Sequence, residues 1–153
     1  MSPDQIKGPD ELKKGQNTVS MNPITNKVLV VDDSNTIRKS AAVFLRQGGH
    51  DVVLAEDGFD ALAKLTSSQP DIVFCDISMP RLDGYQTCAI IKSNEKYAKL
   101  PIVMLSSRDG IFDKARGRVV GAEHYLTKPF TKEQLLEVVK VFGRNSEEKR
   151  NEH

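Results

Sequence analysis

The stretch "DIVFCDISMPRLDGY", residues 71–85, places four consecutive apolar residues directly before an acidic one. An unbroken apolar run of this length, bounded by polar and turn residues, indicates a strand that is buried on both faces of a sheet. The run ends at Asp76, and the Met79-Pro80 and Asp83-Gly84 pairs that follow are typical of turns. The stretch therefore predicts a core strand that presents a carboxylate at its carboxyl end.

The chain on either side alternates between short apolar runs and segments whose apolar residues recur at helical spacing. Five strands and five helices in strict alternation predict an α/β fold, with helices on both faces of a parallel sheet. For a domain of this size we expect a doubly wound, flavodoxin-like (βα)5 sheet with the strand order 2-1-3-4-5. The predicted strands are Lys27–Val31, Asp51–Ala55, Ile72–Cys75, Ile102–Leu105 and His124–Leu126.

Helix boundaries agree with this alternation. The Gly48-Gly49 pair ends the first predicted helix, and Gly121 ends the fourth. Residues 131–134, "TKEQ", form a capping-box pattern that opens the fifth helix.

The chain divides into one compact domain and two polar ends. Residues 1–26 are rich in Pro, Gly, Asn and Lys without sustained periodicity, which predicts a mostly disordered N-terminal extension. Residues 143–153 form a charged tail without core-forming residues. The compact domain covers residues 27–142, and a length of 153 residues suits one domain of ordinary size.

Composition narrows the class of protein. The net charge of +1 lacks the basic surplus that a nucleic-acid or membrane-surface binder needs. No apolar run reaches the roughly 18 to 20 residues of a membrane span, and the N-terminus lacks a signal-peptide pattern. We therefore expect a cytoplasmic protein without membrane insertion or nucleic-acid binding. Cys75 and Cys88 lack metal-site spacing and are expected to be reduced, buried thiols.

Polar side chains follow the predicted strands at one end. Asp32 and Asp33 follow the first strand, Asp76 the third, Ser106 the fourth and Lys128 the fifth. In doubly wound sheets, binding sites lie beyond the carboxyl ends of the strands, near the point where the strand order reverses. The sequence therefore predicts that these groups meet at one edge of the sheet.

Their chemistry indicates a phosphoryl-transfer site. Carboxylates that crowd together repel one another, and Mg²⁺ relieves this repulsion with oxygen ligands. We expect Asp33 and Asp76 to bind the metal directly, Asp32 directly or through water, and the backbone carbonyl of Ser78 to complete the protein ligands. Asp76 can then act as nucleophile. Lys128 can pair with the phosphoryl oxygens, and the Ser106 hydroxyl can donate to them.

Other interpretations remain for single residues and for the whole protein. Asp32-Asp33 could form only a turn and helix cap, Lys128 could be a solvated lysine, and Ser106 an ordinary turn residue. A different class would be an aspartyl-phosphate phosphotransferase or phosphatase enzyme. Such enzymes favour an acid two residues after the nucleophile, where this chain has Ser78. A flavin-type binding protein on the same fold would not need the acids and the lysine together.

Four motifs in combination, "VLVVDDS", "DIVFCDISMPRLDGY", "IVMLSS" and "YLTKPF", resemble the CheY-like receiver domains of two-component response regulators. The resemblance covers about residues 27–142. It implies that Asp76 accepts a phosphoryl group and that Asp32 and Asp33 are the acidic metal pair. It also implies that Ser106 is the switch hydroxyl, Tyr125 the switch aromatic residue and Lys128 the family's lysine, with a cis peptide bond before Pro129.

The resemblance further implies a phosphohistidine on a partner sensor histidine kinase as donor, and a switch rather than an enzyme with a separate substrate. The output surface would be the fourth helix, fifth strand and fifth helix. Residues 108–118 there carry four basic and two acidic side chains, which suits either a solvated face or a docking surface for an acidic protein.

The segments "MPRLDGYQTCAIIK" (79–92) and "LSSRDGIFDKARGRVVG" (105–121) resemble in particular the stand-alone regulators of type IV pilus, twitching-motility systems. Another chemotaxis-type or general two-component pathway is the alternative. Because nothing after Phe142 could form a DNA-binding module, a single-domain regulator that acts on a downstream protein, as a monomer, is expected.

Overall fold

The computed structural model describes residues 24–107 and 111–144. Five parallel strands form one sheet in the order β2-β1-β3-β4-β5, which confirms the predicted doubly wound topology. The strands are β1 (Lys27–Val31), β2 (Asp51–Ala55), β3 (Ile72–Asp76), β4 (Ile102–Ser106) and β5 (His124–Thr127). The last three each extend one residue further than predicted, so Asp76 and Ser106 are the final residues of their strands.

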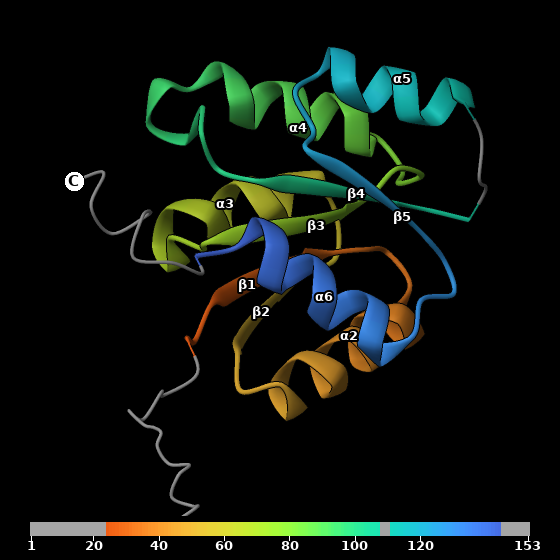
Figure 1. The fold of residues 1–153 in the computed structure, drawn as a ribbon. Helices are drawn as coiled ribbons and strands as arrows, with labels where there is room; N and C mark the ends of the chain where they lie inside the picture. Colours follow the sequence, from red (N-terminus) through yellow and green to blue (C-terminus); the bar gives the residue numbers. More distant parts are fainter. Residues whose placement is uncertain (1–23, 108–110, 145–153) are drawn as a thin grey trace, which may run out of the picture.

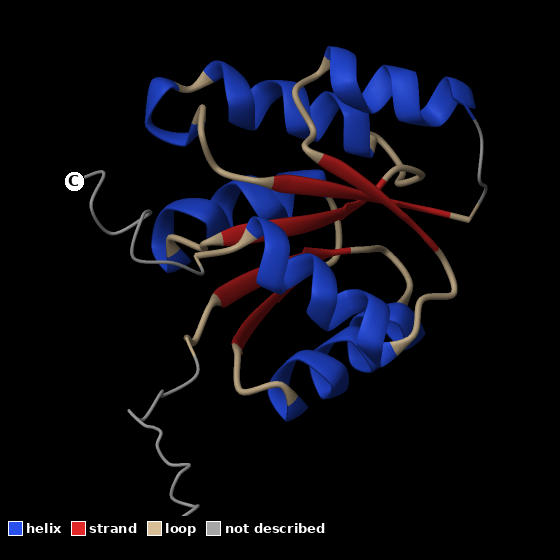
Figure 2. Ribbon diagram, viewed as in Figure 1, coloured by secondary structure: helices blue, strands red, loops and turns tan. Residues whose placement is uncertain are grey.

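Helices cover both faces of the sheet, as Figures 1 and 2 show. One core cluster joins the sheet to α2 and α6, and a second joins it to α3 and α4, with residues that follow α5 packed against it. The central strands β1, β3 and β4 contribute to both clusters, which explains their unbroken apolar sequences. The helices are α2 (Asn35–Gln47), α3 (Gly58–Ser68), α4 (Gly84–Ser93), α5 (Ile111–Val119) and α6 (Lys132–Phe142), with a 3-10 turn η1 (Glu95–Tyr97) before β4.

Side chains at the helix starts satisfy backbone N–H groups that lack a partner within the helix. The predicted capping box of α6 is present, with Thr131 and Gln134 bonding reciprocally. Asp83 and Gln86 form a second capping box, which opens α4 and which the sequence analysis did not identify. The glycines expected to end helices do so. Gly48 caps α2, and Gly49 and Gly121 follow α2 and α5 with positive φ values of 87° and 98°.

Polar contacts close the amino end of the sheet around Asn26, which is 2% exposed. Its side chain accepts a hydrogen bond from the Arg144 N–H at 2.6 Å and donates one to the Arg144 carbonyl at 3.2 Å. Its own N–H donates to Nδ1 of His50 at 3.1 Å. Asn26 and Arg144 belong to the predicted extension and tail, yet both pack on the domain. Residues 1–23 and 145–153 of those segments, and Arg108, lie outside the described residues.

Within the part of the chain that the structure describes, none of the helices has the length and apolar character to cross a membrane.

Candidate functional site

The sheet brings the predicted site residues together at the carboxyl ends of its strands. Asp32 follows β1, Asp76 ends the adjacent β3, Ser106 ends β4, and Lys128 follows β5. The register pairs Val31 of β1 with Cys75 of β3, so Asp32 and Asp76 leave the sheet at the same level. The site lies where strand order reverses between β1 and β3, as expected for this type of sheet.

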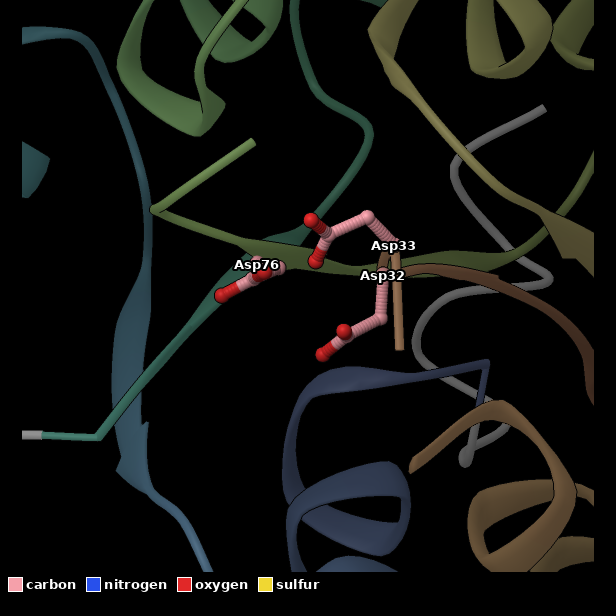
Figure 3. A group of neighbouring side chains, drawn as sticks. All are labelled: Asp32, Asp33 and Asp76. Carbon is pink, nitrogen blue, oxygen red and sulfur yellow. The ribbon is translucent and has the colours of Figure 1, made fainter. Parts of the chain in front are cut away.

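Three carboxylates converge in this site. Asp32, Asp33 and Asp76 each present an oxygen atom, and these oxygens lie within 4.8 Å of one another. Figure 3 shows the three side chains pointing toward a shared space. Asp32 and Asp76 are buried, whereas Asp33 is exposed. A set of three oxygen donors, one of them open to solvent, fits a hard divalent cation such as Mg²⁺, which keeps several of its waters.

Lys128 is the cation of this cluster. Its Nζ lies 3.0 Å from Oδ2 of Asp32 and 3.1 Å from Oδ1 of Asp76. Although burial opposes its charge, these hydrogen bonds raise the pKa of Lys128 above its ordinary value. The peptide bond between Lys128 and Pro129 is cis, as the family resemblance implied. The lysine is therefore a half-buried, charged partner of the acids, and the interpretation of it as a solvated side chain is wrong.

The environment of Asp76 disfavours its charged form. Burial and the neighbouring Asp32 carboxylate raise the pKa of Asp76 to about 6, and the hydrogen bond and charge of Lys128 oppose this rise. The Ser78 N–H adds a long hydrogen bond to Oδ1 of Asp76, at 3.4 Å. At neutral pH the Asp76 carboxylate is mostly ionised. The single positive charge of Lys128 does not balance the negative charge of the three carboxylates.

The acidic pair, Asp32 and Asp33, does not cap the helix that follows it. The N-cap of α2 is Ser34, whose hydroxyl accepts a hydrogen bond from the Ile37 N–H. Oδ1 of Asp32 accepts from the Ser34 N–H at 2.9 Å, so Asp32 stabilises the turn that precedes the helix. Arg38 was not predicted as part of the site, but its Nη1 donates to the Asp32 carbonyl at 2.6 Å. Because Ser34 caps the helix, both carboxylates remain available to the site.

The Ser106 hydroxyl contacts α5. Ser106 is 5% exposed, and its Oγ donates to Oδ2 of Asp113 at 3.3 Å. The hydroxyl of Tyr85, on α4, donates to Oδ1 of the same carboxylate at 3.1 Å. No pattern in the sequence indicates these contacts. Tyr85 and Asp113 lie 28 residues apart on different helices, and Ser106 and Asp113, although seven residues apart, belong to a strand end and a helix.

A cavity of about 300 Å³ adjoins these groups. It lies between the β3–α4 connection, the end of β4 and α5. The residues that line it are Ile77, Ser78, Asp83, Tyr85, Ser106, Ser107, Asp113 and Arg116. The cavity therefore extends from the exposed Ser78, two residues after Asp76, to Ser106 and Asp113.

Tyr125, the residue expected to switch, is half-buried on β5. Its hydroxyl is buried and has no hydrogen-bond partner among the described residues. Nζ of Lys114 lies 5.6 Å from the centre of the Tyr125 ring. The ring also lines a second cavity, of about 260 Å³, between α5 and β5. The aromatic residue therefore has open space beside it on the predicted output surface.

The two thiols take no part in the site. Cys75 and Cys88 are unbridged and buried, as expected. Burial raises the pKa of Cys75 well above its ordinary value and that of Cys88 to about 11, so both stay protonated at neutral pH.

Comparisons with known proteins agree with this geometry. The family model described as the response regulator receiver domain matches residues 28–140. Protein PilG of Pseudomonas aeruginosa is 60% identical over 75% of this chain and 85% of its own length. The alkaline phosphatase synthesis transcriptional regulatory protein PhoP of Bacillus subtilis is 37% identical over 81% of this chain, which spans about half the length of that relative (51%). The chemotaxis protein CheY4 of Vibrio cholerae superposes with a TM-score of 0.75 and 34% identity, covering 78% of this chain and 99% of that one.

Proposed function

Because the chain belongs to the response regulator receiver family, we propose that it is a phosphorylation-dependent switch that accepts a phosphoryl group on Asp76 from a sensor histidine kinase. The observation that carries this proposal is the contact of a half-buried lysine with two buried carboxylates at the carboxyl end of the sheet. The convergence of acids and lysine suits phosphoryl transfer, which depends on positioning and charge neutralisation more than on covalent help.

In the proposed reaction, an oxygen of the Asp76 carboxylate attacks the phosphorus atom of the donor. The bond between phosphorus and the imidazole nitrogen of the kinase breaks, and its electron pair stays on that nitrogen. Hydrolysis later returns the carboxylate, when water attacks phosphorus and releases inorganic phosphate. Because the pKa of Asp76 is about 6, most of the carboxylate is in its nucleophilic form at neutral pH.

Lys128 and Ser106 supply the hydrogen-bond donors. The Lys128 ammonium already donates a hydrogen bond to Asp76. It can therefore donate to the phosphoryl oxygens once they are attached to that residue. The Ser106 hydroxyl, at the end of the adjacent strand, can donate to another of them. When bound by Asp32, Asp33, Asp76 and the Ser78 carbonyl, Mg²⁺ would neutralise phosphoryl charge that the lysine alone does not balance.

We propose that phosphorylation changes the shape of the surface to which a downstream protein binds. Phosphorylation adds roughly 1.5 to 2 negative charges at Asp76. This charge favours an arrangement in which Ser106 and Tyr125 move together, and the surface formed by α5, β5 and α6 changes shape. We propose that a downstream protein binds this surface and that the chain acts as a cytoplasmic monomer.

The pathway we propose is a type IV pilus system that controls twitching motility. The support is the resemblance of residues 79–92 and 105–121 to regulators of such systems, together with the 60% identity to Protein PilG. Expression of this chain in Pseudomonas aeruginosa lacking PilG should restore twitching, and expression of its Asp76→Asn variant should not. Failure of both to restore twitching would favour another two-component pathway.

The phosphorylation step can be tested directly. The protein is incubated with acetyl phosphate and Mg²⁺, and its intact mass is followed with time. We expect an adduct of one phosphoryl group that is absent with EDTA and absent from Asp76→Asn. The matched control is Asp60→Asn, which removes a carboxylate that pairs with Lys64 on α3 and should leave the adduct unchanged. An adduct that persists in Asp76→Asn would contradict the assignment.

A further inference from the structure

We propose that Asp113 is a positioning residue for the switch: it holds the Ser106 hydroxyl proton on α5 until a phosphoryl group on Asp76 competes for it, and Tyr85 orients it. This inference rests on the proposed function of Asp76. It assigns a role to an acidic residue of α5 that lies seven positions after the switch serine.

Contacts from two directions fix the Asp113 carboxylate. Its Oδ2 accepts from Oγ of Ser106 at 3.3 Å, and its Oδ1 accepts from the Tyr85 hydroxyl at 3.1 Å. The same hydroxyl lies 3.3 Å from the Asp113 carbonyl oxygen. One α4 side chain therefore contacts both the side chain and the backbone at the first turn of α5. This arrangement sets the position from which the carboxylate meets Ser106.

The Tyr85 hydroxyl can donate its hydrogen bond to Asp113 in both states of the switch. It is 4% exposed, and the Arg116 guanidinium lies 4.1 Å from the centre of its ring. Burial and the adjacent Asp113 raise the pKa of the Tyr85 hydroxyl to about 12, so it keeps its proton at any physiological pH. The tyrosine can therefore continue to hold Asp113 whether or not Ser106 remains bonded to it.

A hydroxyl has a single proton to donate, so its two possible acceptors compete. Before phosphorylation, Oδ2 of Asp113 is the acceptor, and the strength of a hydrogen bond rises with the charge of its acceptor. Phosphorylation adds a group of higher charge at Asp76, with three acceptor oxygens. The cavity that Ser106 and Asp113 both line gives the hydroxyl room to rotate. The Ser106 hydroxyl thus loses its hydrogen bond to Asp113 and forms one to the phosphoryl group.

The competition links the phosphorylation site to α5 in both directions. When Ser106 leaves, Asp113 loses one of its two side-chain hydrogen bonds from the described residues, on a helix that belongs to the proposed output surface. Reciprocity requires that a change at α5 which weakens the Ser106–Asp113 bond also favours phosphorylation. This route adds to the movement of Tyr125, because it reaches α5 directly from the serine through Asp113.

The test measures the rate constant for adduct formation with acetyl phosphate and Mg²⁺, by intact mass after rapid quenching. Asp113→Ala should raise this rate constant about three- to tenfold, since a long hydrogen bond to a half-buried carboxylate contributes at the low end of the usual range. Tyr85→Phe keeps the ring beneath Arg116 and removes only the hydroxyl. It should change the rate in the same direction by a smaller factor. Glu137→Ala, which removes an exposed acidic residue from α6, is the control for net charge and should leave the rate unchanged.

A merely structural role for Asp113 is distinguished by adding Ser106→Ala. If Asp113 acts through the serine, Asp113→Ala has no further effect on the rate in the Ser106→Ala protein. An equal effect in both backgrounds overturns the inference, as does an unchanged rate in Asp113→Ala and Tyr85→Phe while wild type is phosphorylated normally. Absence of an adduct on wild type would instead reject the proposed function itself, and the inference with it.

Discussion

The two ends of the parallel sheet differ in how completely their polar groups are paired. At the amino end, Asn26 bonds to both backbone groups of Arg144 and to His50, and Oδ2 of Asp71 accepts from the Lys27 N–H at 2.8 Å. At the carboxyl end, three carboxylates meet a single ammonium among the described residues.

The difference separates groups that stabilise the fold from groups that serve its chemistry. A buried polar group that is fully hydrogen-bonded costs little, whereas carboxylates close together with insufficient counter-charge destabilise the folded state. The raised pKa of Asp76 reports this imbalance. Loss of a hydrogen-bond partner at the amino end is therefore expected to lower the stability of the fold, whereas neutralisation of one acid at the carboxyl end is expected to raise it.

The largest expected effect concerns Lys128, the ammonium that contacts the acids of the carboxyl end. Lys128→Met should reduce the rate of phosphorylation from acetyl phosphate about 100-fold or more, because it removes a preorganised donor from the transferring group. The rate is measured by intact mass. The control is Lys39→Met, an exposed lysine of α2, which should react at the wild-type rate. A normal rate in Lys128→Met would show that charge compensation at this end is unimportant for the reaction.

Asp76→Asn should stabilise the fold in metal-free buffer containing EDTA. The folded-state pKa of Asp76, about 6, lies above its ordinary value near 3.8, so the charged carboxylate destabilises the protein above pH 6. This penalty corresponds to roughly 1–3 kcal/mol and disappears as the pH falls from about 6 toward 4. Urea unfolding at pH 7.5 and at lower pH measures both the gain and its loss.

The same substitution at the other end provides the contrast. Asp71→Asn weakens a hydrogen bond to a charged acceptor, so it should lower the free energy of unfolding by about 0.5 kcal/mol. If both substitutions destabilise the protein equally, the two ends of the sheet do not differ in the way described.

Asn26→Ala should destabilise the protein by about 1–2 kcal/mol, because it removes both side-chain hydrogen bonds to Arg144 from a buried position. Phosphorylation should proceed at the wild-type rate, since the contact is at the opposite end of the sheet. Unfolding in urea and the mass assay give the two readouts. Asn35→Ala, at an exposed asparagine of α2, is the control and should change stability by less than about 0.5 kcal/mol.

The smallest expected effect is a pH dependence at the amino end. Burial lowers the pKa of His50, and the charge of Asp51 opposes this shift. Because the folded-state pKa lies below the ordinary value near 6.5, the unfolded chain binds a proton first, and stability falls as the pH drops below about 6.5. Protonation of Nδ1 would also remove the acceptor for the Asn26 N–H.

His50→Gln keeps a possible acceptor but does not titrate. Its stability should therefore fall less than that of wild type between pH 7.5 and 5.5, as measured by urea unfolding at each pH. Identical profiles for the two proteins would argue against a role for His50 in the pairing of the amino end.

Much of the fold could be predicted from the sequence because its signals are local. The runs at 27–31 and 51–55 coincide with β1 and β2, and the alternation with helices confines the strand order to few possibilities. The carboxyl-end site was predictable for a related reason. Once the strands are known to be parallel, the residues that follow Val31, Cys75 and Leu126 must meet at one edge.

Contacts that depend on side-chain reach could not be predicted in this way. Asn26 stands in a polar segment without periodicity, and its partner Arg144 is 118 residues away, so no local pattern indicates that it is buried. The ring of Tyr85 packs in the core beside α4, but the partner of its hydroxyl is on another helix, which no local pattern indicates. The capping box of Asp83 and Gln86 had a sequence signal, an acidic residue followed three positions later by glutamine, which was overlooked.

The contact between Asn26 and Arg144 also makes the domain suitable for circular permutation. These two residues lie side by side, and the extended chain from Asn26 through β1 to Asp32, roughly 20 Å at the usual rise per residue, separates them from Asp32. A short peptide that joins residue 144 to residue 26 would close the chain into a ring without crossing the phosphorylation site. New ends could then be opened in a surface turn such as the one at Gly121. Circular permutants of this kind would place a sensor or effector module beside α5.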